Sequence, residues 1–285
     1  MGPVLREPML TIARTCIVGL VALTVLGSTL VAAGQLEDAW VALRKSDCAS
    51  ALNIWRPLAE QGDAAAQTGL GILYDNGCAV PKDAALALVW YSKAADQGNA
   101  EAEYRLGQAY VLGRKDLPPD RSRGLALMIR AGEHGHATSL RAIGDFYRIG
   151  LFGFSKDDAE AAAWYRKAAD LGSDTAEGHL AIAYELGRGV PKDLGQAAFW
   201  YRRSEEHTRK QAEDGDVAAQ FALGLKYEWG LGARNGLGTI PMDKSAALFW
   251  YRKAAEQDGP LKRQAEIDVA RLEAGIKSGS SKDPP

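Results

Sequence analysis

One phrase recurs down this chain at nearly regular distances. The segment ALVWYSKAADQG at residues 87–98 returns as AAAWYRKAADLG at 161–172, as AAFWYRRSEE at 197–206 and as AALFWYRKAAEQ at 246–257. A unit of this size usually cannot bury its apolar face alone and is stabilised by stacking on its neighbours. The recurrence therefore predicts an array of stacked repeats.

Two further markers keep the same phase. Glycines close the units 36 to 43 residues apart, at Gly62, Gly98, Gly135, Gly172 and Gly215. Aspartates recur 36 to 50 residues apart, at Asp83, Asp120, Asp157, Asp193 and Asp243. An apolar or aromatic residue follows each aspartate seven positions later. Two independent markers in phase are hard to obtain by chance.

Each unit has the pattern of two helices. The first carries small and apolar residues at helical spacing, such as Ala102, Leu106 and Tyr110. A loop rich in Gly and Pro follows, and then an Asp stands where its carboxylate can accept the free N–H groups of a second helix. We expect Gly107 or Ala102 to leave room for the Trp of a neighbouring helix. The pattern predicts an all-α, right-handed α-solenoid of antiparallel helix pairs.

Three motifs carry a family resemblance. The pattern L-G-x-x-Y stands at residues 70–74, G-x-G-V-x-x-D at 187–193 and A-x-x-W-Y-x-K-A-A at 161–169. In these motifs the chain resembles the Sel1-like repeat family, relatives of the tetratricopeptide repeats, over roughly residues 47–258. The departures are Leu127–Met128 in place of Trp–Tyr, Ala181 in place of Gly, and Trp55 at the Tyr position. The resemblance implies an exported bacterial solenoid that binds other proteins.

Two insertions lengthen the array. After Tyr201 the segment RRSEEHTRKQAEDG adds seven residues, which is about two helical turns, so we expect a longer helix that keeps its packing face. The second insertion, GLGARNGLGTIP at 230–241, lengthens a loop. It lacks Gly-Lys-Ser/Thr and follows no strand, so it does not indicate a phosphate site.

The ends of the chain predict three segments. Residues 15–33 are a continuous apolar run, preceded by Arg6 and Arg14 and followed by small and polar residues. This is the layout of a signal peptide cleaved near Ala33 or Gly34, and an uncleaved membrane anchor is the open alternative. The predicted segments are a leader at 1–34, a repeat solenoid with capping helices at 35–276, and a disordered tail at 277–285. We expect a periplasmic or secreted protein, anchored to the membrane if the leader is retained.

Two cysteines, Cys48 and Cys78, lie beyond the leader. Antiparallel packing should bring the helix that starts at Cys48 near the end of the next helix at Tyr74, only a loop away from Cys78. A disulfide would suit an oxidising compartment, and two separate thiols are the alternative.

Reactive groups are few. No H-E-x-x-H motif, nucleophile elbow or Cys–His arrangement is present, so we expect no catalytic residues, no metal and no cofactor. His134 and His136 flank Gly135 without a nearby Cys or carboxylate at metal-ligand spacing, which favours a solvated turn. The chain has 34 Lys and Arg against 36 Asp and Glu, a formal net charge of −2 that gives no indication of nucleic-acid binding.

The family resemblance also places a binding surface. In helix-pair solenoids the first helices form a concave wall, and its positions here stand two residues before and one residue after each Leu-Gly pair. The candidate partner-binding residues are Tyr104, Gln108, Arg141, Asp145 and Phe221. The same positions in other units hold Thr68, Ile72, Gly178, Ile182 and Leu225. The alternative is that these residues are half-buried contacts between neighbouring helices.

The sequence favours a binding protein over an enzyme. The leading hypothesis is a non-catalytic scaffold that holds a protein or peptide partner in the cell envelope, with a regulatory role. One alternative is recognition of a polysaccharide or peptidoglycan fragment, which would favour exposed aromatics such as Tyr104 and Trp229. The other is a cell-wall hydrolase, which would need a reactive cluster.

Overall fold

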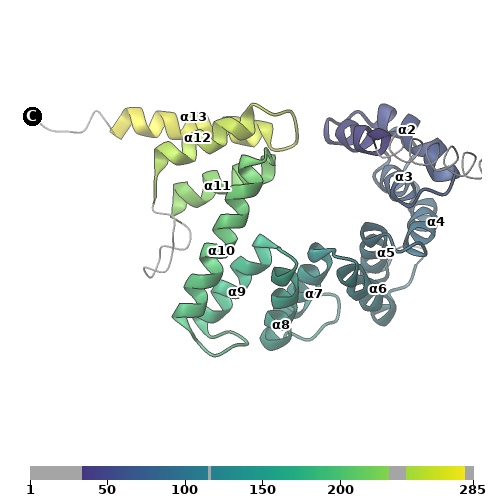
Figure 1. The fold of residues 1–285 in the computed structure, drawn as a ribbon, viewed down its shortest axis with the longest axis horizontal. Coiled ribbons are helices and arrows are strands. Elements are labelled where there is room, and N and C mark those ends of the chain that lie inside the picture. Colours follow the sequence, from purple (N-terminus) through teal and green to yellow (C-terminus); the bar gives the residue numbers. More distant parts are fainter. Residues whose placement is uncertain (1–33, 115–116, 231–241, 280–285) are drawn as a thin grey trace, which may run out of the picture. The chain divides into compact units, whose positions relative to one another are not determined.

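The computed structural model describes residues 34–114, 117–230 and 242–279, and these residues are helical with short connections (Figure 1). Residues 34–44 form the first described helix. The helices that follow are α2 (Cys48–Glu60), α3 (Ala64–Asn76), α4 (Ala84–Ala95), α5 (Ala100–Leu112), α6 (Arg121–Glu133), α7 (Ala137–Ile149), α8 (Asp158–Asp170), α9 (Asp174–Leu186), α10 (Leu194–Glu213), α11 (Val217–Trp229), α12 (Lys244–Ala255) and α13 (Lys262–Gly279). The described residues contain no strand, only an isolated bridge between Arg114 and Leu117.

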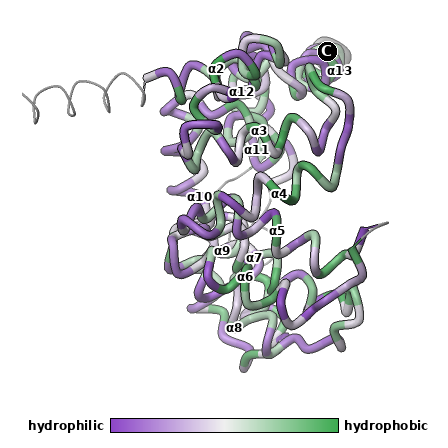
Figure 2. Tube along the Cα trace, turned by 90° about the vertical axis from the view of Figure 1, so that its right-hand side faces the viewer, coloured by the Kyte–Doolittle hydropathy of each residue, from purple (hydrophilic) through white to green (hydrophobic). Residues whose placement is uncertain are grey.

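Consecutive helices pack in pairs. Helix α5 packs on α6, α7 on α8, α9 on α10 and α11 on α12, and successive pairs also contact each other. Hydrophobic and hydrophilic residues are interspersed along the chain trace (Figure 2), as expected for helices that have a packing face and a solvated face. This arrangement confirms the predicted all-α solenoid of helix pairs. The chain divides into two compact units, Met1–Trp90 and Tyr91–Pro285.

The predicted cap residues start the second helix of each pair. Asp157 Oδ1 accepts the N–H groups of Ala159 and Glu160 at 2.9 and 3.0 Å, at the start of α8. Glycine ends the first helices, because Gly150 and Gly187 adopt φ angles of +75° and +68° that disfavour other residues. The equivalent caps are Asp83, Asp120, Asp193 and Asp243.

In α8 the tyrosine of the Trp–Tyr pair, and not the tryptophan, fills the space beside the small residues of the first helix, whereas in α10 Trp200 is buried and Tyr201 is half-buried. A Cβ atom placed on Gly144 would stand 2.7 Å from Tyr165 Cε1. Tyr165 is buried, whereas Trp164 is half-buried with the Lys167 ammonium 3.9 Å from its ring centre. The expectation that Trp occupies this space was therefore wrong for the α7–α8 pair. On an α-helix, adjacent residues point about 100° apart, so only one of the pair can face the partner helix.

The pair with Leu127–Met128 packs in a different way. A Cβ on Gly107 would lie 2.7 Å from Met128 Cγ and 2.8 Å from the carbonyl oxygen of Gly124. The backbones of α5 and α6 therefore approach closely, and the unbranched Met fills the space that Tyr occupies elsewhere.

Buried carboxylates join neighbouring helices in two of the repeats. Glu103 on α5 is fully buried, and its oxygens bind Arg130 Nε at 2.6 Å and His134 Nδ1 at 2.9 Å, both on or at the end of α6. Arg130 also donates to the carbonyl of Ala95, near the end of α4. The turn histidine His134 is exposed, as expected, and its Nδ1 also lies within hydrogen-bond distance of the buried Glu103 carboxylate.

The same arrangement returns two repeats later. Glu177 on α9 binds Arg203 Nε at 2.8 Å and His207 Nδ1 at 3.1 Å, and Arg203 donates to the carbonyl of Ala169. In the last repeat Gln220 stands at the Glu position, and its amide donates directly to the carbonyl of Ala212 at 3.0 Å. A carboxylate cannot donate a hydrogen bond, so an arginine supplies the donor where Glu replaces Gln.

The ends and the first insertion agree with most of the expectations. Helix α10 is 20 residues long and absorbs the insertion after Tyr201, as predicted. In the closing helix α13, Leu272 is buried, but Ile267 is exposed and does not belong to the packing face. Helix α13 ends at Gly279, so the tail predicted from residue 277 begins inside it. The leader at 1–33, the loop at 231–241 and residues 280–285 lie outside the described residues.

Candidate functional site

The predicted wall residues of α5 and α7 form two pairs within their helices. Gln108 Nε2 donates to the Tyr104 hydroxyl at 2.7 Å, and Arg141 Nη1 lies 2.5 Å from Asp145 Oδ2. All four side chains are half-buried. Residues four positions apart lie on one face of an α-helix, so each pair forms a single polar patch on its helix.

Asp145 is the centre of a wider cluster. Its Oδ1 accepts the Tyr165 hydroxyl proton at 2.7 Å and lies 3.4 Å from Arg148 Nη2. Arg148 Nε in turn donates to the Tyr165 oxygen at 2.9 Å. The His179 Nε2 of α9 stands 3.8 Å from Asp145 Oδ1, and its ring stacks on Tyr165 with 4.6 Å between ring centres. The cluster thus joins α7, α8 and α9.

A second contact joins α5 to α7. His136, the residue before α7, lies with its ring centre 4.7 Å from that of Tyr104, and its Nε2 is 2.9 Å from Glu101 Oε2. Arg105 Nε lies 2.5 Å from the other oxygen of Glu101. His136, like His134, is therefore paired with a carboxylate and is not a free turn residue.

Burial shifts the pKa values of Tyr165, His179 and Tyr104. Burial raises the pKa of the Tyr165 hydroxyl, and the hydrogen bond to Asp145 raises it further. Burial lowers the pKa of His179, which keeps the imidazole neutral near pH 7. Burial also raises the pKa of Tyr104, so both phenols stay protonated hydrogen-bond donors.

Phe221, the fifth predicted residue, does not join this cluster. Its ring packs against Tyr251 with 5.3 Å between centres, and it lies beside the buried Ala247 and Leu272. Phe221 therefore contributes to packing at the α11–α13 end, as the alternative interpretation proposed. In the first compact unit, Thr68 and Ile72 are also buried and belong to the core.

A row of exposed aliphatic side chains continues the wall and was missed by sequence reasoning. Leu112, Ile149 and Leu186 are the last residues of α5, α7 and α9, and they are 48%, 48% and 51% exposed. They follow Gln108, Asp145 and Ile182 by four residues, so they extend the same helix faces. The signal in the sequence is the apolar residue before each capping glycine. Trp229 holds the same position on α11 and is 60% exposed.

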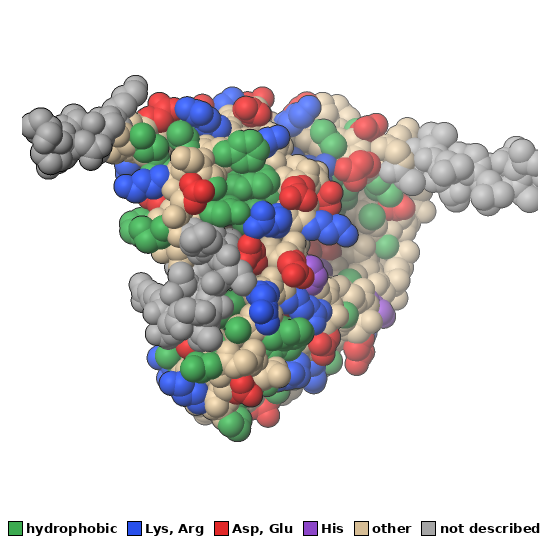
Figure 3. Space-filling view, turned by 60° about the vertical axis from the view of Figure 1, so that its left-hand side comes forward, with side chains coloured by type: hydrophobic (Ala, Val, Ile, Leu, Met, Phe, Trp, Pro, Cys, Tyr) green, Lys and Arg blue, Asp and Glu red, His purple; other side chains and the backbone are tan. Residues whose placement is uncertain are grey.

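The described residues contain no group of three or more His, Cys, Asp or Glu side chains that could bind a metal ion. In the view of Figure 3, Lys and Arg side chains alternate with Asp and Glu between groups of hydrophobic side chains. Among residues 34–114, 117–230 and 242–279, no helix is both long and apolar enough to cross a bilayer.

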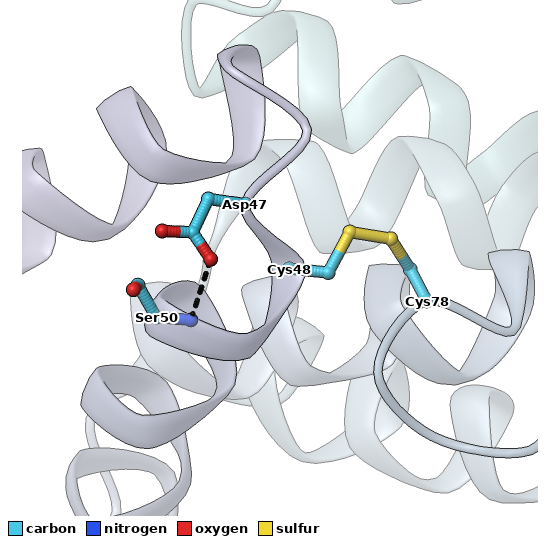
Figure 4. The surroundings of a disulfide bond; sticks show 4 residues. All are labelled: Asp47, Cys48, Ser50 and Cys78. Carbon is cyan, nitrogen blue, oxygen red and sulfur yellow. Dashed lines mark hydrogen bonds between the residues drawn. A yellow bond between two sulfur atoms is a disulfide. The ribbon is translucent and has the colours of Figure 1, made fainter.

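Cys48 and Cys78 are joined by a disulfide bond (Figure 4). Their Cα atoms are 5.7 Å apart, which is an ordinary separation for a disulfide. Cys48 is the first residue of α2, and Asp47 caps this helix by accepting the Ser50 N–H at 3.1 Å. A hydrogen bond from the Ser50 side chain, together with the one from its N–H, lowers the pKa of Asp47. The disulfide ties the start of α2 to the loop that follows α3.

Comparison with known proteins identifies the repeats. The Sel1 repeat profile matches residues 64–99, 100–136, 137–173, 176–207 and 217–259, which is well over half of the chain. The chain belongs to the Sel1 repeat family. The first of these Sel1 repeats covers α3 and α4, and the other four correspond to the helix pairs described above, from α5–α6 to α11–α12.

The similar curated proteins include fungal regulators. The chain is 33% identical over 122 residues to chitin synthase regulator SKT5 of Malassezia restricta, covering 42% of this chain and 8% of the relative. It is 27% identical over 223 residues to chitin synthase regulatory factor 3 of Schizosaccharomyces pombe, covering 76% of this chain and 22% of the relative. The match thus spans less than a quarter of either regulator.

Solved structures share the fold. The c5321 protein of uropathogenic Escherichia coli, a protective antigen with an SLR fold, is 29% identical with a TM-score of 0.50, covering 89% of this chain and 59% of that one. An immunity protein of Pseudomonas aeruginosa, Pa5087, is 24% identical with a TM-score of 0.51, covering 79% and 81% of the two chains. This second similarity concerns the fold alone. Proteins of the Sel1 repeat family act as protein-interaction scaffolds.

Proposed function

We propose that this Sel1 repeat protein is a non-catalytic adaptor that holds a protein partner on the wall formed by α5, α7 and α9. The observation that carries the proposal is the side-by-side placement of half-exposed polar groups around Asp145 and of the exposed row Leu112, Ile149 and Leu186. Exposed apolar side chains bordered by polar groups are typical of protein interaction sites.

The names of the relatives support a regulatory role. Two fungal relatives are named as regulators of chitin synthase, and so as proteins that act on an enzyme. A solenoid stabilised by contacts between neighbouring repeats can vary its wall residues without losing its fold. We therefore propose that the partner is a protein whose activity or assembly the adaptor controls.

Binding of a polysaccharide is the second candidate. The 60% exposed Trp229 favours it, because an open aromatic ring can stack on a sugar. The ring of Tyr104, the other aromatic that this hypothesis would use, is already in contact with the tilted ring of His136. We therefore prefer the protein partner.

Affinity capture from envelope extracts tests the proposed function. The full chain and a Tyr104→Ala/Arg141→Ala/Leu186→Asp variant are immobilised in parallel, together with an Arg202→Ala control on the exposed surface of α10. We expect the wild-type and control proteins to retain the same proteins and the triple variant to lose them, with all three equally helical by circular dichroism. Retention of soluble glycan in place of protein would favour the second candidate, and equal capture by all three would contradict the wall as the binding site.

We also propose that the protein works outside the cytoplasm. The apolar run at residues 15–33 supports export, and the Cys48–Cys78 disulfide suits an oxidising compartment. Intact-mass measurement of natively expressed protein should show loss of the first 33 or 34 residues. A full-length chain in membranes would indicate an anchor, and a full-length chain in the soluble cytoplasmic fraction would contradict export.

A further inference from the structure

We propose that the partner segment is acidic and aliphatic: it places a carboxylate on Arg141 and Arg148, and aliphatic side chains on the row Leu112, Ile149 and Leu186. This inference rests on the proposed function, because it specifies the partner of the same wall. It commits to a protein segment and not to a glycan or a nucleic acid.

The charges around Asp145 do not balance. Arg141 and Arg148 share the single carboxylate of Asp145, and their side chains are 27% and 43% exposed. The neighbouring Arg105 already has its own partner in Glu101. His179 adds no charge near pH 7, because burial lowers its pKa. The α7 part of the wall thus has an excess of one positive charge, which a partner carboxylate would neutralise.

Unused hydrogen-bond donors surround the two arginines. A guanidinium carries five N–H groups, and Arg141 gives one of them to Asp145. The Tyr104 hydroxyl accepts a proton from Gln108 and, within the described residues, donates its own to no acceptor. Burial raises the pKa of the Tyr104 hydroxyl, and the nearby Arg141 charge partly opposes that shift, which places the two side chains close together. A ligand rich in acceptors, such as a carboxylate, fits a surface that offers donors.

The aliphatic row decides between the classes of acidic partner. Ile149 follows Arg148 directly in the chain, and Leu112 and Leu186 hold the equivalent positions on the neighbouring first helices. Nucleic acids and acidic glycans offer anionic groups but few aliphatic side chains. A protein segment offers both carboxylates and Leu, Ile or Val side chains, so it alone matches both parts of the wall.

Selection from a defined library gives the first test. A phage-displayed library of random 12-residue peptides is selected on the full chain and, in parallel, on the Leu186→Asp variant. We expect wild-type selection to enrich peptides that combine Asp or Glu with Leu, Ile or Val, and the variant to lose this enrichment. Enrichment of basic peptides, or of peptides without an acidic residue, would overturn the inference while leaving a peptide-binding function in place. A wild-type selection without enrichment would count against both proposals.

A charge cycle on the most enriched peptide gives the second test. Its affinity is measured by fluorescence anisotropy for the peptide and its Glu→Gln or Asp→Asn form, against wild-type protein, Arg148→Gln and the exposed control Arg202→Gln. We expect removal of the peptide carboxylate to weaken binding to the wild type and the control at least tenfold, and to Arg148→Gln less than threefold. Equal losses on all three proteins would show that the carboxylate does not contact Arg148 and would overturn the assignment.

The aliphatic row needs its own control. Leu194 is 44% exposed at the start of α10, so Leu194→Asp introduces the same change away from the wall. We expect Leu186→Asp to weaken binding of the enriched peptide at least tenfold and Leu194→Asp to leave it unchanged, with melting temperatures that match the wild type. Binding of an acidic polysaccharide such as polygalacturonate with equal affinity by wild type and Leu186→Asp, together with failure of the peptides to bind, would point to a glycan instead.

Discussion

At the scale of single residues, the two members of the Trp164–Tyr165 pair in α8 have different roles. Tyr165 is buried against Gly144 and donates its hydroxyl proton to Asp145, so it connects the core to the wall. Trp164 is half-buried and lies against Lys167. A change at Tyr165 therefore removes more contacts than the same change at its larger neighbour.

We predict that Tyr165→Ala lowers the free energy of unfolding by about 3–5 kcal/mol, the usual cost of truncating a buried aromatic side chain. Trp164→Ala should cost about 1–2 kcal/mol, since it loses only part of a buried surface. Denaturant midpoints measured by circular dichroism compare the two. A larger loss at Trp164 would contradict the packing assigned here.

Replacement of the cap residue in the same helix should cause a smaller loss of stability. Asp157→Ala should cost about 1 kcal/mol, because it removes the acceptor of two N–H groups at the start of α8 and no buried surface. A loss as large as that of Tyr165→Ala would indicate a further role for Asp157.

At the scale of the helices, matched sets of side chains join the first and second helices of a repeat. Repeats with a buried Glu have Arg and His at fixed positions on the second helix, as in Glu103, Arg130 and His134. In the last repeat these positions hold Gln220, Lys253 and Gln257, and the two glutamines bind each other at 3.0 Å. The chain thus contains two alternative solutions for one junction.

We predict that Glu103→Gln alone lowers the free energy of unfolding by about 1–3 kcal/mol, because Arg130 and His134 lose their carboxylate. The triple variant Glu103→Gln/Arg130→Lys/His134→Gln copies the last repeat and should recover most of that loss. Urea denaturation of the single and triple variants is the measurement. A triple variant less stable than the single one would show that the sets are not interchangeable.

The last junction, between α11 and α13, depends on pH. Arg271 hydrogen-bonds Glu228 and holds its pKa below the ordinary Glu value; burial opposes this shift, and the Tyr251 hydroxyl adds to it. A carboxylate with a lowered native pKa stabilises the fold above its unfolded-state pKa, and the stabilisation is lost as pH falls through the native value. Glu228 therefore stabilises the closing helix at neutral pH and not in acid.

We predict that Glu228→Gln is less stable than the wild type at pH 7 and that the difference shrinks below about pH 4. Guanidinium midpoints of both proteins at pH 7, 5 and 3 follow the change. The neighbouring charge Asp268 contacts Arg271 at 2.7 Å, so an Asp268→Asn control separates its contribution. A difference that grew in acid would contradict the ion pair.

At the scale of the whole molecule, the two compact units differ in how they are held together. The first contains the Cys48–Cys78 disulfide, which joins residues 30 positions apart. The second unit, from Tyr91 onward, depends on packing and on its hydrogen-bonded junctions. In a repeat protein each repeat contacts only its neighbours, so a substitution in one compact unit should mainly change the stability of that unit.

We predict that Cys48→Ser/Cys78→Ser lowers the stability of the first unit by about 3 kcal/mol, the usual effect of opening a loop of this length. Hydrogen exchange followed by mass spectrometry should show faster exchange in peptides from residues 34–90 and little change from residue 100 onward. Uniformly faster exchange along the whole chain would mean that the two units unfold together.

The sequence alone determined the helix pairs and their ends. Asp caps, capping glycines and apolar spacing are local patterns, and their signals lie within a few residues of the structure that they specify. For the same reason the lengthened α10 followed from counting residues after Tyr201. The assignment of Tyr104, Gln108, Arg141 and Asp145 to a binding wall came from the family resemblance and stays a prediction; the structure places all four half-buried on α5 and α7.

Only the tertiary structure decided which side chains meet. The structure places Tyr165 in the core, pairs His134 and His136 with carboxylates and packs Phe221 against Tyr251. These contacts join residues that are 17 to 35 positions apart or lie on different helices. Such contacts depend on how closely two helices approach and on the angle at which each side chain leaves its helix. A local pattern contains neither quantity, because both arise only when neighbouring repeats stack.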